Sequence, residues 1–274
     1  ILDHEPAMTQ EGALIGGLRT HIPSVEMSTA GVGGDSYVRM HDATLHLGPE
    51  RVLPVCMAGT LPDPEEWIAS GQTSRLIRLA PGNPAGDSLV EQTLKESGPI
   101  TPGNLAKRLN LSRVRLNGML EPLLRRRLVQ ETGFTPTDAL HVLGKLDLGD
   151  SEVSKRAAAH LAQAMGVAAD AFAEQVITAA CKAIEDVVLS QVLYMEVGHS
   201  MAGLISHRHE YRMLRVELQL LPPIIGLGAA AKELLPRVAK SLGCELILPD
   251  HYEVGNAMGA VLLASTLDQD CQTG

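Results

Sequence analysis

The last quarter of the chain carries the pattern that most restricts its fold. An apolar run over residues 216–225 leads into the glycine turn 226–230, and a helical pattern follows over 232–242. A second apolar segment, 244–249, precedes a final helical pattern over 255–267. Strands that alternate with helices in this way lie parallel, because the helix carries the chain back to the start of the next strand. This region therefore predicts an α/β layer with a parallel pair of strands.

The turn Gly226-Leu227-Gly228-Ala229 lies where a ligand can approach the backbone. Glycine has no Cβ to block that approach, and the start of the following helix offers unpaired N–H groups and the positive end of the helix dipole. A nucleotide is one ligand that suits this position. The alternative is an ordinary strand-to-helix turn, because a short glycine pair is a weak signal.

A second glycine turn, residues 31–36, ends an apolar run near the start of the chain. It holds three glycines, among them Gly33 and Gly34, followed by Asp35 and Ser36. The glycines expose backbone amides, and the two polar side chains are suited to orient a magnesium-bound water or a phosphate. The alternative is a β-hairpin with Gly-Gly-Asp turn chemistry.

Residues 88–134 follow the order of a winged helix-turn-helix. Ser88 is a good cap for a first helix, Thr101-Pro102 starts a second, and Ser112 caps a third. Residues 128–134 then indicate a strand and a turn, the place of the β wing. The segment divides the chain into three predicted parts, namely a β-rich part (1–87), the winged-helix insert (88–134) and an α/β part (135–274).

Three further segments complete the expected organisation. Residues 59–87 contain many Pro and Gly and are expected to end the β-rich part as an irregular connector, and 135–150 are expected to form a loop. Two long Ala-rich helices are predicted over 151–195, separated near Gly166, the second with one buried face.

The insert concentrates positive charge. Between residues 107 and 127, Glu121 is the only acid among seven basic residues, namely Lys107, Arg108, Arg113, Arg115, Arg125, Arg126 and Arg127. Such a charge pattern is typical of a recognition helix. The alternatives are a structural insert or a protein-docking module. Because Pro122 is expected to break or bend the third helix and the whole chain is acidic, DNA is not expected as a partner.

Composition excludes several classes of protein. The net charge is −9 and there are only seven aromatic residues, so a general nucleic-acid binder with a base-stacking platform is not expected. No apolar run has membrane-spanning length. The four cysteines lie far apart, which rules out a disulfide scaffold and a zinc ribbon and suits the cytoplasm.

No metal site stands out among the side chains. The group His207, His209 and Glu210 alternates on a polar stretch, where solvated surface is the more frequent outcome, and His41 and His46 receive the same interpretation. Cys181 lies in an apolar helix and is predicted to be part of the core. Asp138, in Thr-Pro-Thr-Asp-Ala, is predicted from its position to be a helix cap.

Taken together, five stretches resemble the hydantoinase A/5-oxoprolinase family. They are Gly-Gly-Leu-Arg-Thr (16–20), Gly-Val-Gly-Gly-Asp-Ser (31–36), Gly-Pro-Glu-Arg (48–51), Thr-Pro-Thr-Asp-Ala-Leu-His-Val-Leu-Gly (135–144) and the region 226–264. The resemblance implies an α/β ATPase fold of the actin, sugar-kinase and Hsp70 type, with two ribonuclease-H-like halves. It also implies an enzyme that uses ATP and Mg²⁺ to hydrolyse a cyclic amide, usually with a B-type subunit as partner.

The resemblance also implies roles for individual residues. Gly33, Gly34, Asp35 and Ser36 would line the cleft, with Asp35 and Ser36 as catalytic residues. Gly226, Gly228 and Ala229 would form the adenosine-side loop, with Asn256 and Gly259 beside it. Asp138 would hold a loop on the substrate side. The common expectation is that two distant glycine turns fold together to wall one nucleotide crevice.

The chain departs from the family pattern in one important respect. The two phosphate-binding turns of such ATPases, Asp-x-Gly-x-Thr and Asp-Ile-Gly-Gly-Thr, do not occur in it. Since residue 1 is Ile and the opening looks like a strand in progress, we expect a fragment or subunit that is inactive without the missing N-terminal half. A chain trimmed of a disordered leader is the other explanation. Two alternative functions stay open, a winged-helix transcription regulator with a sugar-kinase-like sensor domain and a non-catalytic assembly subunit.

Overall fold

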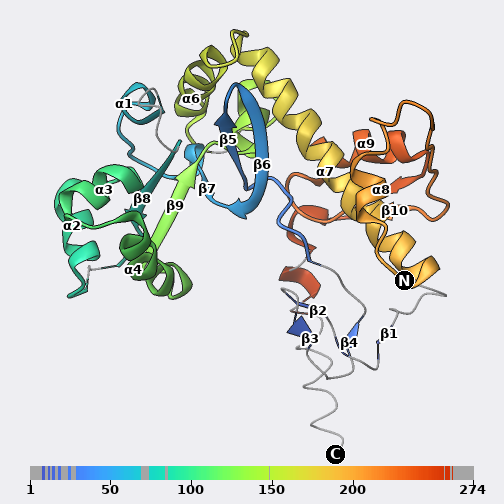
Figure 1. The fold of residues 1–274 in the computed structure, drawn as a ribbon, viewed down its shortest axis with the longest axis horizontal. Coiled ribbons are helices and arrows are strands. Elements are labelled where there is room, and N and C mark those ends of the chain that lie inside the picture. Colours follow the sequence, from blue (N-terminus) through green and yellow to red (C-terminus); the bar gives the residue numbers. More distant parts are fainter. Residues whose placement is uncertain are drawn as a thin grey trace, which may run out of the picture. The chain divides into compact units, whose positions relative to one another are not determined.

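The computed structural model shows a mixed α/β protein that divides into two compact units (Figure 1). One unit comprises residues 1–31 and 185–217, and the other, larger unit comprises 32–184 and 218–274. The structure describes residues 8–9, 12, 14–15, 18–19, 24–25, 29–68, 74–83, 86–147, 149–255, 257–259 and 261. Within these ranges, no helix is long and apolar enough to cross a membrane.

The larger unit begins with an antiparallel hairpin. Strand β5 (Ser36–His41) pairs with β6 (Thr44–Arg51), and the turn between them places Asp42 and Ala43 at positive φ. The second strand continues through Gly48 and Pro49 to Arg51, so that Arg51 pairs with Ser36 and lies beside the glycine turn.

A mixed three-stranded sheet follows, in the order β7, β9, β8. Strand β9 (Val129–Gly133) pairs in parallel with β7 (Leu53–Pro54) and antiparallel with β8 (Arg75–Leu79). The predicted irregular connector over 59–87 is therefore wrong in part, because it contains β8 and the short helix α1 (Pro64–Ile68). Leu76 and Ile77 of β8 are buried, and the packing of these side chains stabilises the segment as a strand.

The three helices of the insert form where predicted, and the third continues through Pro122, so the expected break is absent. They are α2 (Leu89–Ser97), α3 (Pro102–Arg108) and α4 (Arg113–Arg125). Each begins at the expected cap, whose hydroxyl accepts a hydrogen bond from the backbone N–H three residues on. The three helices lie beside β8 and β9 (Figure 1). Their apolar faces form one core with these strands, built around Val90, Leu94, Leu105, Leu116 and Leu120.

The predicted β wing does not follow the third helix. The antiparallel partner of β9 is β8, which precedes all three helices, and β9 leads directly into the next helix. The chain thus connects β8 to β9 through the three helices and not through a hairpin loop. The assignment of 88–134 as a winged helix stays a prediction.

The segment expected as a loop after residue 135 is helical. Helix α5 (Pro136–Val142) starts with a capping box, in which Thr135 and Asp138 bond each other's backbone N–H groups. Asp138 was predicted as the N-cap; the N-cap is Thr135, and Asp138 takes part as the third helical residue, whose carboxylate accepts from the Thr135 N–H. The Thr-Pro-Thr-Asp stretch contains all the signals of a helix start, and the loop prediction gave them too little weight.

Asp138 also ties three segments together. Its wholly buried carboxylate accepts bonds from the N–H groups of Val55 and Cys56, from Thr135 N–H and hydroxyl, and from the hydroxyl of Ser154 on helix α6 (Ser151–Gln163). Burial raises the pKa of Asp138, and these hydrogen bonds oppose that rise. Burial, followed by the nearby Asp138 charge, raises the pKa of the Cys56 thiol as well.

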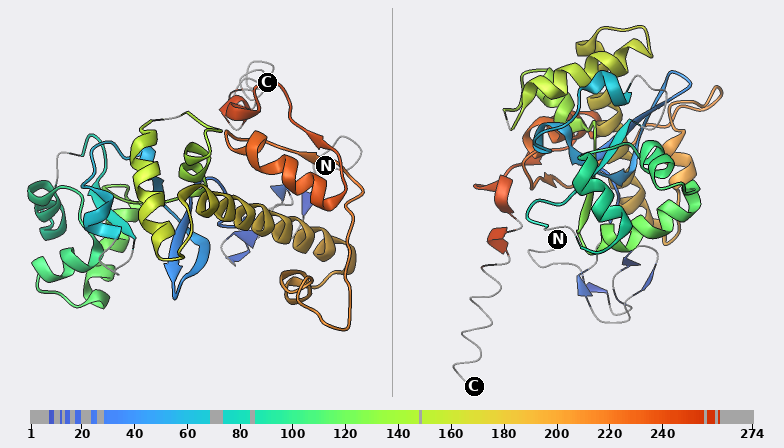
Figure 2. Two further views of the ribbon diagram at one scale, coloured as in Figure 1. Left: turned by 90° about the horizontal axis from the view of Figure 1, so that it is seen from above. Right: turned by 90° about the vertical axis from the view of Figure 1, so that its left-hand side faces the viewer.

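The two predicted Ala-rich helices are confirmed as α6 and α7 (Ala169–Val197). In the larger unit, α9 (Ala231–Leu242) lies along α7 (Figure 2), with the thiol of Cys181 donating to Leu234 O and Arg237 paired with Glu174. Cys181 is buried, as predicted.

The predicted parallel pair is confirmed as β10 (Ile224–Ile225) and β11 (Leu246–Ile247), although both strands are shorter than expected. The helix predicted over 255–267 lies mostly outside the described residues.

The smaller unit is described only in part. It contains two antiparallel pairs, β1 (Met8–Thr9) with β4 (Ser24–Val25) and β2 (Leu14–Ile15) with β3 (Leu18–Arg19). It also contains α8 (Ala202–Ser206), after which the buried Arg208 pairs with Glu185 and Asp186. Most of the resembling stretch 16–20 lies outside the described residues.

We expect Asp138→Asn to lower the free energy of unfolding by about 3 kcal/mol, because the amide NH₂ faces donors that the carboxylate had satisfied. Urea denaturation measures the loss. The matched control is Asp147→Asn, since Asp147 is exposed. Equal stability of the two variants would show that the buried carboxylate does not hold these segments together.

A second prediction concerns Glu91, which is buried and accepts from Ser88 Oγ, Gly86 N and Asn83 Nδ2. These bonds, Ser88 first, lower its pKa from 4.5. A lowered folded-state pKa stabilises the fold above pH 4.5, and the contribution disappears as the pH falls through the folded-state value. Glu91→Gln should therefore cost about 1 kcal/mol at pH 7 and progressively less in acid. Denaturation from pH 7 to 3, with exposed Glu96→Gln as control, tests this; a gap that stays constant with pH contradicts it.

Candidate functional site

The two glycine turns meet in one cavity of the larger unit. The cavity has a volume of about 490 Å³ and is lined by residues 32–35 from the first turn and 227–231 from the second. Arg51, Thr137, Ile184, Leu234 and Leu235 complete its wall. The predicted meeting of two distant glycine turns around one hollow is thus present in the structure.

Gly34 is the point at which the two turns touch. Its carbonyl oxygen accepts from both the N–H (2.9 Å) and the hydroxyl (2.8 Å) of Thr137, in the first turn of α5. A Cβ placed on Gly34 would lie 2.8 Å from Thr137 Oγ1 and 3.3 Å from the Ala230 Cβ at the start of α9. Only glycine allows this approach without displacing a neighbour.

An ion pair supplies the charge in the cavity. Arg51 Nε lies 2.9 and 2.8 Å from the two carboxylate oxygens of Asp35, and its terminal nitrogen lies 2.7 Å from one of them. The hydrogen bond that Arg51 donates to Asp35 raises the pKa of Arg51, which therefore stays charged. About two thirds (65%) of the Arg51 side chain is exposed, so that an anion in the cavity can reach it.

The second turn contributes backbone donors. Gly228 has a φ of +104°, which L-residues rarely adopt, and its N–H bonds Tyr252 O. Its carbonyl accepts from Ala231 N. Among the residues that the structure describes, no acceptor bonds the N–H groups of Ala229 and Ala230, which precede α9. Unpaired N–H groups at a helix start, together with Arg51, suit an anionic ligand.

Comparison with known protein families identifies the family of the chain. The chain matches the hydantoinase/oxoprolinase family (Hydantoinase_A) over residues 1–269. The chain belongs to the hydantoinase/oxoprolinase family. Neither the curated proteins nor the solved structures contain a match. Membership in the hydantoinase/oxoprolinase family indicates a hydrolase of the cyclic-amide type.

Several of the residues predicted for the site stand at this cavity and others do not. Gly33, Gly34, Asp35, Gly228 and Ala229 line it. Ser36 is wholly buried, and its hydroxyl accepts from Gly33 N–H at 2.8 Å, so the side chain shapes the turn instead of facing the cavity.

Three more predicted residues lie away from the cavity wall, and one is undetermined. Gly226 is buried where a Cβ would meet Leu235 and Leu248, so it packs the strand end against α9. Asp138, in the first turn of α5, is buried and holds this helix and its Thr137 in place. Gly259 does not line the cavity. Asn256 lies outside the described residues.

Arg51 and Thr137 were not predicted as site residues. Both belong to stretches that resemble the family, 48–51 and 135–144, so the signal was present. It was missed because the distance from Arg51 to Asp35 depends on the hairpin running on to its pairing with Ser36. Thr137 requires α5, which the sequence analysis expected as a loop.

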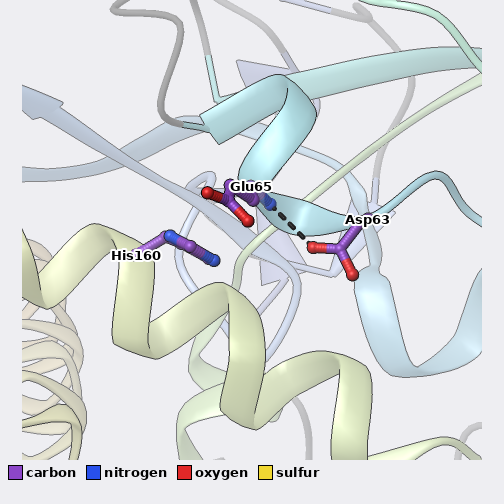
Figure 3. Close-up of side chains that lie close together, drawn as sticks. All are labelled: Asp63, Glu65 and His160. Atoms are coloured by element: carbon purple, nitrogen blue, oxygen red, sulfur yellow. Dashed lines mark hydrogen bonds between the residues drawn. The ribbon is translucent and has the colours of Figure 1, made fainter.

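Among the residues that the structure describes, one cluster brings together side chains of metal-ligating types. Asp63 and Glu65 at the start of α1 and His160 of α6 point toward one another (Figure 3), with ligand atoms within 4.8 Å. Asp63 already bonds Glu65 N–H (3.0 Å) and pairs with Arg156 (2.6 Å), one turn before His160. The group therefore has an explanation as a contact of α1 with α6.

The histidines considered in the sequence lie on exposed surface. His207 bonds Glu210 at 3.0 Å with both side chains exposed, and His41 pairs with the adjacent Asp42. The imidazole rings of His41 and His46 lie edge to face, with centroids 6.4 Å apart. These contacts match the solvated-surface interpretation.

We expect Gly34→Ala to lower the free energy of unfolding by about 1 to 3 kcal/mol, because the added methyl group overlaps Thr137 and Ala230. Urea denaturation measures the loss. The adjacent Gly33→Ala is the matched control, since its Cβ meets only an Asp35 oxygen at 3.6 Å. If both variants unfold like the parent chain, the turns do not touch as described.

Proposed function

We propose that this cavity binds the adenine nucleotide of an ATP-dependent cyclic-amide hydrolase. The observation that carries the proposal is that two glycine turns, almost two hundred residues apart in sequence, line one cavity with Arg51 at its edge. Family membership supports the type of reaction, and the cavity supports the use of a nucleotide.

The residues present fit a nucleotide. The apolar side chains Val32, Ile184, Leu227 and Leu235 give the wall a surface for a base. The N–H groups of Ala229 and Ala230 and the Arg51 guanidinium provide donors for phosphate oxygens. Asp35 is the carboxylate available for a magnesium-bound water, and it is held in position by Arg51.

When bound, ATP supplies the phosphoryl group that converts an amide oxygen into a leaving group and makes the carbonyl carbon reactive to water. The chain's own contribution is positional. Arg51 keeps its positive charge near the phosphates, because Asp35 raises its pKa. The Gly34 and Gly228 turns fix the two walls at a set distance, and catalysis of phosphoryl transfer depends mostly on such positioning and electrostatics.

We further propose that this chain works with polypeptide that carries the two phosphate-binding turns, and with a B-type subunit. Neither turn occurs in the 274 residues. In the parallel pair β10–β11 the apolar side chains of Ile225 and Ile247 are exposed, and so is Leu221 shortly before β10. Parallel sheets are normally covered on both faces, so these side chains suit contact with further structure of the actin and sugar-kinase type of fold.

The test is equilibrium binding of a fluorescent ADP analogue to the chain, with Mg²⁺. We expect saturable binding that Arg51→Gln weakens about tenfold, through loss of a charge-assisted bond. Glu50→Gln is the matched control, because Glu50 is the preceding residue, does not line the cavity and pairs with Arg39. Absence of binding, or equal affinity in the two variants, would contradict the nucleotide site.

A second readout separates binding from turnover. An ATPase assay with this chain alone should show no magnesium-dependent hydrolysis above background, because the phosphate-binding turns are absent. Robust hydrolysis would contradict the proposed need for further polypeptide while leaving the nucleotide site intact.

A further inference from the structure

The solvent-exposed face of helix α4 contains residues that packing does not explain. Its core side is formed by Leu116, Leu120 and Leu123, which are buried. On the opposite side, Val114, Gly118, Glu121 and Arg125 follow one another at spacings of four, three and four residues, and all are exposed. Val114 is 81% exposed and takes no part in the core.

Gly118 leaves the helix backbone bare in the middle of this face. A Cβ at this position would meet nothing within 4 Å, so neither packing nor backbone conformation requires glycine. Alanine would favour the helix more. Four residues on, Pro122 has no N–H, so the Gly118 carbonyl lacks its usual helical donor and stays available to an outside partner.

At the C-terminal end of helix α4, an arginine stands at a position where glycine is the usual residue. Helix α4 finishes in a Schellman motif, with Arg127 N bonded to Leu124 O and Leu128 N bonded to Leu123 O. Arg127 occupies the left-handed position with φ +55°, where glycine is the usual residue. Helix α5 ends in the same pattern with Gly144 at that position. Arg127 thus stands where glycine would stabilise the helix end more, and Gly118 stands where alanine would stabilise the helix more.

Charge around this helix differs sharply from the rest of the chain. The seven basic residues between 107 and 127 are all exposed, and of these only Arg125 forms an ion pair with a described residue. With Glu121 the segment has a net charge of +6, while the other residues carry 16 basic and 31 acidic side chains, a net charge of −15. The acidity of the whole chain predicts no affinity for DNA, but the local charge around α4 is that of a polyanion-binding surface.

We propose that α3, α4 and the turn between them form a binding surface for duplex DNA, with α4 in the major groove. Helix α4 has 13 residues and is about 20 Å long, enough to cross a groove about 12 Å wide. Val114 and the bare backbone at Gly118 allow close approach to base edges. The arginines at both ends of the helix reach the flanking phosphates.

Other polyanions fit this surface less well. The deep, narrow major groove of an RNA duplex does not admit a helix, and the segment has no aromatic side chain for stacking single-stranded bases. The apolar face of α4 is already buried in its own core, so it is not available to insert into a membrane.

The experiment is fluorescence anisotropy of a labelled 25-base-pair duplex of mixed sequence, titrated with the full 274-residue chain at 50 to 200 mM NaCl. We expect binding whose logarithmic salt slope is about −4, which corresponds to four or five phosphates. The double variant Arg113→Glu/Arg115→Glu should weaken it at least tenfold. Lys182→Glu/Lys240→Glu changes the net charge equally at exposed positions elsewhere and should have a much smaller effect.

Two single substitutions distinguish a binding role from a structural one. Gly118→Ala and Arg127→Gly should each raise the melting temperature by about 2 to 4 °C, yet weaken DNA binding. Arg127→Gly should also lower the salt slope by about 1. Gain of stability with unchanged affinity would remove both residues from the interface.

Three outcomes would overturn the proposal. They are no duplex binding at 50 mM salt, equal loss of affinity in the two double variants, and tighter binding to single-stranded RNA or to vesicles containing phosphatidylserine. None of these readouts depends on the nucleotide site, so the two proposals stand or fall separately.

Discussion

The buried carboxylate of Asp138 is the interaction on which the arrangement of the larger unit depends. It joins the backbone at Val55 and Cys56, the start of α5 and, through Ser154, helix α6. Desolvating a carboxylate is costly, and only a complete set of donors compensates for that cost. Since Asp138 fixes the start of α5, it also fixes Thr137, which bonds the carbonyl of Gly34.

The position of the cavity wall depends on these contacts of Asp138 and Thr137. Thr137 holds the first glycine turn, and Gly34 lets that turn lie against Ala230 at the start of α9. Helix α9 is in turn held along α7 by Cys181 and by Arg237 with Glu174. The wall of the cavity is thus set by these contacts, while Asp35 and Arg51 remain accessible at its edge. A rigid frame with exposed polar groups is the arrangement that a binding site requires.

Local signals in the sequence predicted much of this structure. Ser88, Thr101 and Ser112 marked three helix starts, and the glycine pair after the strand at 225 marked α9, because caps and turns are decided by nearby residues. The nearness of Gly34 and Gly228 was expected only through the family resemblance. The position of Arg51 and the pairing of β9 with β8 could not be predicted, since both depend on strand pairing between distant segments.

The central claim is that two turns distant in sequence form one nucleotide crevice, and amide chemical shifts test it most directly. In ¹⁵N-resolved spectra of the chain titrated with ADP and Mg²⁺, the amides of Gly34 and Gly228 should shift together, with the same apparent Kd. The amides of the insert, such as Gly118, should stay unchanged. If ADP moves the amide of only one of the two turns, or moves neither, the account of a shared crevice is contradicted.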